Sequence, residues 1–396
     1  APGDEPYADA AAWLAEADAF YEASIDPEGV EIAIPIIWGI DAVHGHANLT
    51  GATVFPHNIG LGAARDPDLI EEIMKVTAAE LILSGHDWTF APTLAVPRDD
   101  RWGRSYEGFS EDPALVASYA DRIVYGLQGR PGTSSFFGDK RVISSAKHFV
   151  GDGGTTRGID QGDTQITERE MLNIHAAGYM PAIEAGVQTI MASFNSWNGV
   201  KMHGSEYMLT DVLKTRMGFQ GFVIGDWNGH GQIPGCTNTD CPRSFIAGVD
   251  MYMAPDSWKG IYETTLAAVQ SGEISMERLD DAVRRILRVK VQAGLFEKSK
   301  PSERIGANQI DLLGSEAHRN IARRAVQQSM VLLKNKDSLL PLSADMTVLV
   351  IGDGADSISK QAGGWTLSWQ GGGYANSDFP HADSILDGIR AVLGAG

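Results

Sequence analysis

Asp226 stands at the end of a short apolar run and is the first residue whose surroundings suggest chemistry. Residues 222–224 are apolar, Gly225 ends the run, and Asp226 and Trp227 follow at once. In α/β barrels the catalytic groups lie at the carboxyl ends of the strands, where a carboxylate can act as nucleophile, acid or base. A lone Asp after a strand also commonly caps the next helix. The catalytic interpretation of Asp226 therefore depends on other strand ends converging with it.

Polar side chains also follow other apolar runs that we predict to be strands. They supply a carboxylate, a guanidinium, an ammonium and an imidazole, in the residues Asp41, Arg104, Lys147 and His148. Tryptophans flank these positions, namely Trp38, Trp102, Trp197 and Trp227. Indole faces pack on the C–H patches of sugars while charged groups bond to the hydroxyls, so this combination suits a sugar site. We predict that the polar side chains share one pocket with Asp226.

Each of these residues also has a purely structural explanation. Asp41 suits a helix cap, Arg104 an ion pair with Glu107, Lys147 a solvated surface charge and His148 a core position. Taken one at a time, these explanations compete with the catalytic one. Their joint occurrence at the ends of apolar strands is what favours a shared site.

The predicted elements alternate between strands and helices. We predict strands at 34–39, 88–96, 142–146, 189–193, 222–224 and 251–254, and helices at 7–25, 66–83, 112–128, 167–186, 205–217, 259–271 and 276–293. This alternation predicts a parallel α/β architecture, and residues 1–296 fit a (β/α)8-type TIM barrel of typically about 250 residues. A doubly wound open sheet is the alternative. No Gly-x-Gly-x-x-Gly motif opens a helix after the first strand, so a dinucleotide-binding fold lacks support.

The remaining residues predict a linker and the start of a second domain. Residues 297–345 are expected to form a linker that packs on the barrel, and 346–396 the first part of an α/β sandwich domain. In that part we predict a buried strand at 348–351, a Gly- and Trp-rich segment at 363–373 and a helix at 383–393. Because one strand and one helix cannot form an independent domain, we expect this domain to be incomplete in this chain.

The charge composition of the chain argues against some classes of binding partner. The 396 residues include 32 basic and 51 acidic ones, giving a formal net charge of -19, which argues against nucleic acid and anionic membranes. No apolar run reaches the roughly 20 residues of a membrane span, and residues 1–5 do not resemble a signal peptide, so we expect a soluble chain. Cys236 and Cys241 are the only cysteines. They lack a third ligand for a metal, and a disulfide between them would indicate an oxidising compartment.

Four short motifs contain the candidate site residues, namely Gly39-Ile40-Asp41-Ala42-Val43-His44-Gly45, Arg101-Trp102-Gly103-Arg104, Lys147-His148-Phe149 and Gly225-Asp226-Trp227. Together they resemble glycoside hydrolase family 3, most closely its β-glucosidase and exo-β-glucanase members. The resemblance continues through residues 331–335 and 363–365. It implies a retaining enzyme that forms a covalent glycosyl-enzyme on Asp226 and needs neither a cofactor nor a metal.

The resemblance also implies roles for the other site residues. Asp41, Arg104, Lys147 and His148 match positions that hold the sugar at the nonreducing end, and Trp227 and Trp369 match a pair that sandwiches the next sugar. The chain departs from plant relatives at Phe194, where they carry Tyr, at Gln161, where they carry Glu, and at Gln232, near their Arg. We include Phe194 among the substrate-binding residues, and these departures leave linkage preference open.

The acid/base residue is not identifiable in this chain. In two-domain relatives a Glu of the second domain has this role, at a position beyond residue 396. One branch uses a His that is absent from the stretch Lys147-His148-Phe149-Val150-Gly151-Asp152-Gly153, where Asp152 is expected to shape a turn.

We therefore expect an exo-acting β-glucosidase that releases glucose from short β-glucans or cello-oligosaccharides. The expected partner is a β-linked oligosaccharide, with no nucleic acid and no membrane, and the expected location is periplasmic or secreted. Alternatives are a β-xylosidase or other glycosidase of the same family, a sugar-binding relic without its acid/base, and a Schiff-base lyase acting through Lys147.

Overall fold

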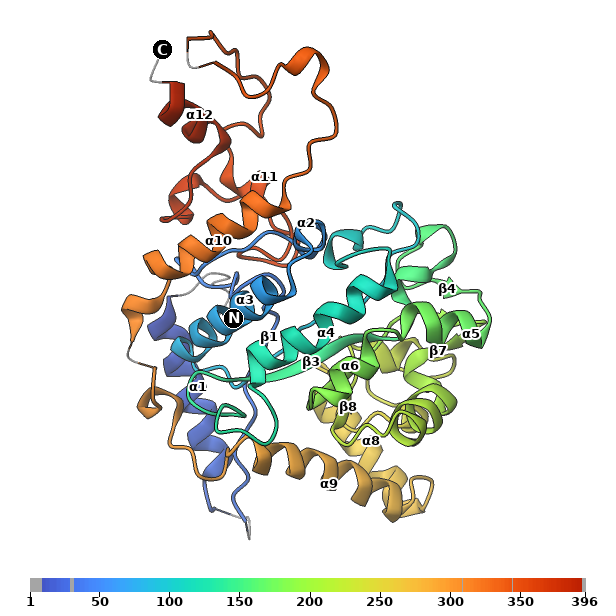
Figure 1. Cartoon of the computed structure of the whole chain (residues 1–396). Helices are drawn as coiled ribbons and strands as arrows, with labels where there is room; N and C mark the ends of the chain where they lie inside the picture. The colour runs from blue at the N-terminus through green and yellow to red at the C-terminus, as the bar shows by residue number, and fades with distance from the viewer. Residues whose placement is uncertain (1–8, 29–31, 308, 344, 394–396) are drawn as a thin grey trace.

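The computed structural model describes residues 9–28, 32–307, 309–343 and 345–393 (Figure 1). Its central sheet is parallel and has the order β1-β2-β3-β5-β8, which is also the order along the chain. These strands are Gly39–Ile40, Trp88–Thr89, Ile143–Phe149, Thr189–Ala192 and Phe222–Ile224. Met251 adds a parallel bridge to Ile224. The α/β prediction is confirmed, and the sheet is consistent with a barrel.

The strand order argues against a doubly wound sheet, because such a sheet reverses its strand order at a switch point. The structure shows no such reversal in the five described strands. Eight strands are not seen in this sheet among the described residues, so the (β/α)8 count stays a prediction. The predicted strands 34–39 and 88–96 shrink to two residues each. Each contains a proline, Pro35 or Pro92, whose nitrogen cannot donate to a ladder.

The helices on the outside of the sheet follow most of the predicted ranges. They are α1 Ala10–Ile25, α2 Asn58–Ala64, α3 Pro67–Leu83, α4 Pro113–Gln128, α7 Pro242–Ala247, α8 Trp258–Ser271 and α9 Met276–Gln292. Asp66 and Asp112 cap α3 and α4 by accepting from the backbone N–H groups of Leu69 and Ala114. The predicted first residues of α1, 7 and 8, lie outside the described residues.

Two predicted helices are irregular. The range 167–186 divides into α5 Glu168–Glu170, a π-helical turn Met171–His175 and α6 Tyr179–Glu184, and 205–217 is a π-helix over Tyr207–Arg216. Thr167 opens the first of these with the expected capping box to Glu170. Pro181 lacks the N–H that would continue a single helix through this range.

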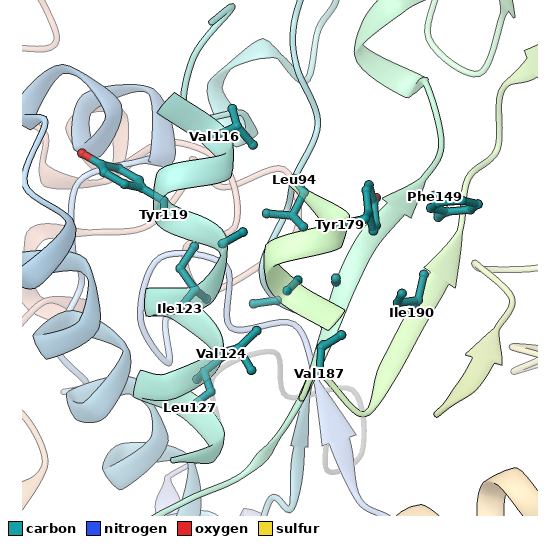
Figure 2. Close-up of a cluster of buried hydrophobic side chains, with 14 of the residues drawn as sticks. Leu94, Val116, Tyr119, Ile123, Val124, Leu127, Phe149, Tyr179, Val187 and Ile190 are labelled. Carbon is teal, nitrogen blue, oxygen red and sulfur yellow. The ribbon is translucent and has the colours of Figure 1, made fainter. Parts of the chain in front are cut away.

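The main core packs α4 against α6 and the strands that carry the site (Figure 2). On α4, apolar residues recur three or four positions apart, which places them on one face of the helix. Figure 2 shows Val116 and Val124 on the side of α4 that faces α6, Tyr119 on the opposite side, and Phe149 and Ile190 of β3 and β5 beyond α6. All of them are buried. The packing fixes β3, which contains Lys147 and His148, and β5, which ends two residues before Phe194.

A second, small sheet lies beside the first and was not predicted. Strand β4 (Asp163–Thr164) pairs in parallel with β6 (Ser196–Trp197), which forms a hairpin with β7 (Val200–Lys201). The turn residues Asn198 and Gly199 both have positive φ, 48° and 88°. An Asn-Gly pair between two short strand-forming segments strongly indicates a hairpin, so this hairpin could have been predicted from the sequence.

Residues after 296 pack on the preceding helices only in part. Helix α10 (Glu316–Ser329) lies against α2 and α3 (Figure 1). The buried carboxylate of Glu80 on α3 accepts hydrogen bonds from Gly314 N and His318 Nδ1, at 3.0 and 2.8 Å. Residues 331–342 are exposed, with Leu333 at 90%. The predicted packing therefore applies to α10 and does not extend to 331–342.

The strand predicted at 348–351 is wrong. The structure has no strand there, and Leu349 and Ile351 are 84% and 80% exposed. A β-strand needs neighbours to satisfy its backbone groups, and none of the described residues pairs with this segment. The predicted helix 383–393 is confirmed as α12 (Ile385–Leu393), and α11 spans Ile358–Ala362. No helix in the described ranges is both long and apolar enough to cross a bilayer.

Candidate active site

Four of the predicted site residues gather at the carboxyl end of the parallel sheet. Asp41 follows β1, Lys147 and His148 lie near the end of β3, and Asp226 follows β8 by two residues. Lys147, His148 and Asp226 are buried, whereas Asp41 is about a quarter exposed. Lys147 Nζ lies 2.5 Å from Asp41 Oδ1. Parallel strands end on the same edge of a sheet, which is why residues far apart in the chain meet here.

Arg104 joins the group through a buried carboxylate. Its Nε and Nη2 lie 2.6 and 2.8 Å from the two carboxylate oxygens of Glu107, a bidentate pair. Its Nη2 is also 3.2 Å from His148 Nε2. The ion pair with Glu107 is thus real, and it holds Arg104 in the site. Sequence reasoning treated Glu107 only as a competing explanation and missed this positioning role.

The Arg104–Glu107 pair keeps both charges in spite of burial. Burial alone raises the pKa of Glu107, but the Arg104 guanidinium outweighs it and, with Lys147 and His148, lowers that pKa to about 2. Burial likewise opposes the charge of Arg104, yet Glu107, Asp226 and Asp152 raise its pKa above the usual range. The site therefore presents a fixed positive charge beside His148.

This pair predicts a pH dependence of stability. The folded pKa of Glu107, about 2, lies below its ordinary value of 4.5, so its stabilising contribution is present above about pH 4.5 and is lost as pH falls through 2. Urea unfolding between about pH 5 and about pH 2 should show a shallower loss of stability for Glu107→Gln than for the native chain. Equal slopes for the two proteins would contradict the assignment.

His148 is oriented by Asp152, a residue expected only to shape a turn. Asp152 Oδ2 is 2.7 Å from His148 Nδ1, and Asp152 Oδ1 accepts from the backbone N–H of Gly153 at 3.0 Å. Arg104 can only donate, so its contact with His148 Nε2 makes that nitrogen an acceptor and places the ring proton on Nδ1. Asp152 therefore shapes the turn, as expected, and also selects the tautomer of His148.

Hydrogen bonds to Oδ1 and to the backbone N–H hold Asp226 in place, while Oδ2 makes none with the described residues. Its Oδ1 accepts from Trp227 N at 2.7 Å, and its own N–H donates to His203 Nε2 at 2.9 Å. Burial lowers the pKa of His203 to about 4, although Asp226 opposes the shift, so the ring is a neutral acceptor. Asp226 Oδ2 is buried without a partner among the described residues and lies 3.7 Å from His148 Nε2.

The Gly- and Trp-rich segment brings an unpredicted aromatic residue into the site. The Trp365 ring lies 5.1 Å from Lys147 Nζ, a cation–π distance. Its segment docks on the loop after β1, where His57 Nε2 and His44 Nε2 contact the carbonyls of Gly364 and Trp365 at 2.8 and 3.1 Å. Trp365 belongs to a motif used for the family resemblance, which was the available signal for its role.

The two tryptophans predicted to sandwich a sugar are both exposed. Trp227 and Trp369 have 58% and 57% of their surface accessible. Trp369 lies beside Trp365, with ring centroids 6.4 Å apart. Phe194 is half-buried, and its ring centroid lies 6.0 Å from that of His203. The sandwich between Trp227 and Trp369 stays a prediction, as does substrate contact by Phe194.

Comparisons with known proteins identify the family. The profile described as "Glycosyl hydrolase family 3 N terminal domain" matches residues 7–289, and the one described as "Glycosyl hydrolase family 3 C-terminal domain" matches residues 330–395. The chain belongs to glycosyl hydrolase family 3. The resemblance seen in the four motifs is thereby confirmed.

Similar proteins in this family are named as β-glucosidases or exo-β-glucanases. The chain is 35% identical to "Lysosomal beta glucosidase" of Dictyostelium discoideum over 378 residues, covering 92% of this chain and 45% of the relative. It is 33% identical to "Periplasmic beta-glucosidase" of Salmonella typhimurium, covering 92% and 46%. The crystal structure of exo-1,3/1,4-beta-glucanase from a Pseudoalteromonas species superposes with a TM-score of 0.97 at 52% identity, covering 99% and 49%. The chain thus spans about half the length of these proteins.

Two further observations bear on the predicted chemistry. Cys236 and Cys241 form a disulfide, with Cα atoms 4.9 Å apart, a pairing that the sequence had left open. Lys147 Nζ lies 2.5 Å from Asp41 Oδ1 in an ion pair, whereas a Schiff base requires a free amine. The geometry therefore disfavours the lyase alternative.

Proposed function

We propose that this chain carries the glucosyl-binding pocket and nucleophile of a retaining, exo-acting β-glucosidase or exo-β-glucanase. One observation carries the proposal, namely that Asp226 Oδ2 is buried and unpartnered beside His148. His148 Nε2 lies 3.7 Å from this oxygen, Arg104 contacts the same His148 nitrogen, and Lys147 is paired with Asp41. The glucosidase and glucanase names of the relatives support glucose as the sugar.

In the proposed reaction Asp226 Oδ2 attacks the anomeric carbon as the bond from that carbon to the leaving oxygen breaks. The leaving oxygen takes the bonding electrons and a proton from an acid/base residue. Water, deprotonated by the same residue, then displaces Asp226 and restores its carboxylate, so two inversions retain the β-configuration. We assign no residue of the described structure as this acid/base.

The polar floor of the pocket would hold the sugar hydroxyls. Asp41 offers a carboxylate acceptor next to the Lys147 ammonium, and the Arg104 guanidinium and His148 imidazole lie nearer Asp226. Hydrogen bonds to the hydroxyls that tighten as the ring flattens would lower the barrier as well as the dissociation constant. We propose that Trp227 and Trp369 contact the next sugar with their exposed faces.

Labelling with a 2-deoxy-2-fluoro-β-glucosyl fluoride tests this proposal. The fluorine at C2 slows both steps, and the fluoride leaving group needs no general acid, so the nucleophile is tested apart from the acid/base. We expect a covalent fluoroglucosyl adduct on the peptide that contains Asp226, detected by mass spectrometry. A label on another carboxylate would refute the assignment, and no adduct would favour the sugar-binding relic.

A β-xylosidase is the second candidate. A protein named "Beta-xylosidase" from Formosa agariphila is 30% identical over 389 residues, covering 93% of this chain and 52% of the relative. Glucose differs from xylose by a hydroxymethyl group, so comparing kcat/KM for aryl β-glucoside and aryl β-xyloside distinguishes the two. A higher kcat/KM for the xyloside would mean that the preferred sugar is xylose and not glucose.

We propose a periplasmic or secreted location and a division of the chain at about residues 296 and 345. The Cys236–Cys241 disulfide supports an oxidising compartment, and one relative is named periplasmic. The change from barrel elements to α10 and then to exposed chain supports the division. Location of the protein in fractionated cells tests the first proposal.

A further inference from the structure

Lys201 joins three loops at the rim of the site. Its Nζ donates to the carbonyl oxygens of Phe194 and Gln161, at 2.8 and 3.1 Å, and to Gln232 Oε1 at 2.9 Å. These acceptors lie on the loops that follow β5, β3 and β8, three adjacent strands of the parallel sheet. One ammonium therefore connects three segments that are separate in the sequence.

A hydrogen bond between two glutamines closes the arrangement. Gln232 Nε2 donates to Gln161 Oε1 at 2.8 Å. Because lysine can only donate, the amide of Gln232 must present its oxygen to Lys201 and its nitrogen to Gln161, which fixes its orientation. Both glutamines are exposed, so this assembly stands at the outer rim of the site. We call Phe194, Gln161, Gln232 and Lys201 the rim cluster.

The rim cluster is connected to the nucleophile through the chain. Lys201 is followed by Met202 and then His203, whose Nε2 accepts the backbone N–H of Asp226. Met202 N donates to the carbonyl of Asn195 at 3.1 Å, which keeps this segment against the loop after β5. Gln232 lies on the same loop as Asp226, six residues later. Lys201 is therefore connected to the loop that contains Asp226 in two ways, through His203 and through Gln232.

We propose that Lys201 is a positioning residue that holds the rim cluster together and thereby shapes the binding site for the leaving-group sugar. This inference rests on the proposed function. All three protons of the ammonium are engaged, so Lys201 has no donor left for the substrate and acts through the residues it holds. The exposed rim is the part of an exo-acting site that faces the portion of the substrate outside the pocket. Partial burial, opposed by Asp163, lowers the pKa of Lys201, as expected for an ammonium held by neutral acceptors.

The test combines hydrogen–deuterium exchange with binding. Lys201→Met keeps the aliphatic stem and removes all three donors, while Lys201→Arg keeps a cation with several donors. In Lys201→Met we expect faster exchange in the three loops around residues 161, 194 and 232, with the core strands unchanged. Lys201→Arg should restore part of the protection, and Lys334→Met, a change at an exposed lysine in the linker, should leave exchange as in the native chain.

Binding is measured in an Asp226→Asn background so that substrate is not hydrolysed. We expect Lys201→Met to weaken the affinity for a β-linked glucose disaccharide about tenfold relative to glucose. Unchanged exchange in the loops would overturn the proposal, as would exchange that rises throughout the barrel. Faster loop exchange with an unchanged disaccharide-to-glucose ratio would overturn the specificity role. If Asp226→Asn with native Lys201 binds neither sugar, the proposed function fails, while exchange still decides whether Lys201 holds the loops.

Discussion

Replacing Asp226 with asparagine should lower kcat for an aryl β-glucoside by about four orders of magnitude. Asparagine keeps the size of the side chain, and its amide oxygen still accepts from Trp227 N, where Oδ1 now does at 2.7 Å. The change removes only the charge and nucleophilicity of Oδ2, the buried oxygen without a hydrogen-bond partner in the described structure. Thermal unfolding should therefore change far less than activity.

Two controls sharpen this prediction. Asp256→Asn alters an exposed carboxylate after the Met251 bridge and should leave kcat unchanged. In Asp226→Ala, added azide should restore part of the turnover and yield the α-glycosyl azide, because a small anion then takes the place of the missing carboxylate. Near-native activity of Asp226→Asn, or a β-glycosyl azide from Asp226→Ala, would rule out Asp226 as nucleophile.

Replacing Asp250 with asparagine should lower the free energy of unfolding by about 3–5 kcal/mol. The Asp250 carboxylate is completely buried and receives Lys214 Nζ at 2.7 Å, the Arg278 guanidinium and the backbone N–H of Val223 at 2.8 Å. Val223 lies in β8, the strand that leads to Asp226. Burial already lowers the pKa of Lys214, against the attraction of Asp250. Without this carboxylate, Lys214 and Arg278 keep the partly exposed Asp281, at 3.5 and 3.2 Å, but lose their buried partner.

Urea unfolding followed by circular dichroism measures this effect. Asp353→Asn is the matched control, because it removes an exposed partner of Lys360 and should leave stability within the error of the measurement. A loss below about 1 kcal/mol for Asp250→Asn would show that water or rearranged side chains compensate for the missing charge.

The structure places four predicted site residues at strand ends, as expected, namely Asp41, Lys147, His148 and Asp226. This prediction succeeded because it depends only on nearby residues in the sequence. Apolar runs that end in Gly or in a polar residue indicate where a buried strand stops, and parallel strands stop at a common edge. The same reasoning found α3 and α4 from an Asp-Pro pair and an apolar face. These features depend on neighbours a few residues apart.

The strand predicted at 348–351 is wrong although its local pattern is typical of a strand, because none of the described residues pairs with it. Residues 348–351 are apolar, and Val348, Val350 and Ile351 are β-branched, as is typical of strands, yet the structure places them in no ladder. Strand formation depends on another segment supplying the opposite hydrogen bonds. No pattern within four residues can report whether that segment is present.

The sequence by itself determined the family, since the types and order of its motifs match family 3, and from this match we predict the nucleophile and the residues around it. Only the tertiary structure decided how these groups are held: Glu107 on Arg104, Asp152 on His148, Trp365 against Lys147, and Lys201 across three loops. Several of these contacts join residues far apart in the chain, and all depend on distances of a few ångströms. Which donor meets which acceptor is set by the packing of the whole barrel, and a linear pattern does not contain that geometry.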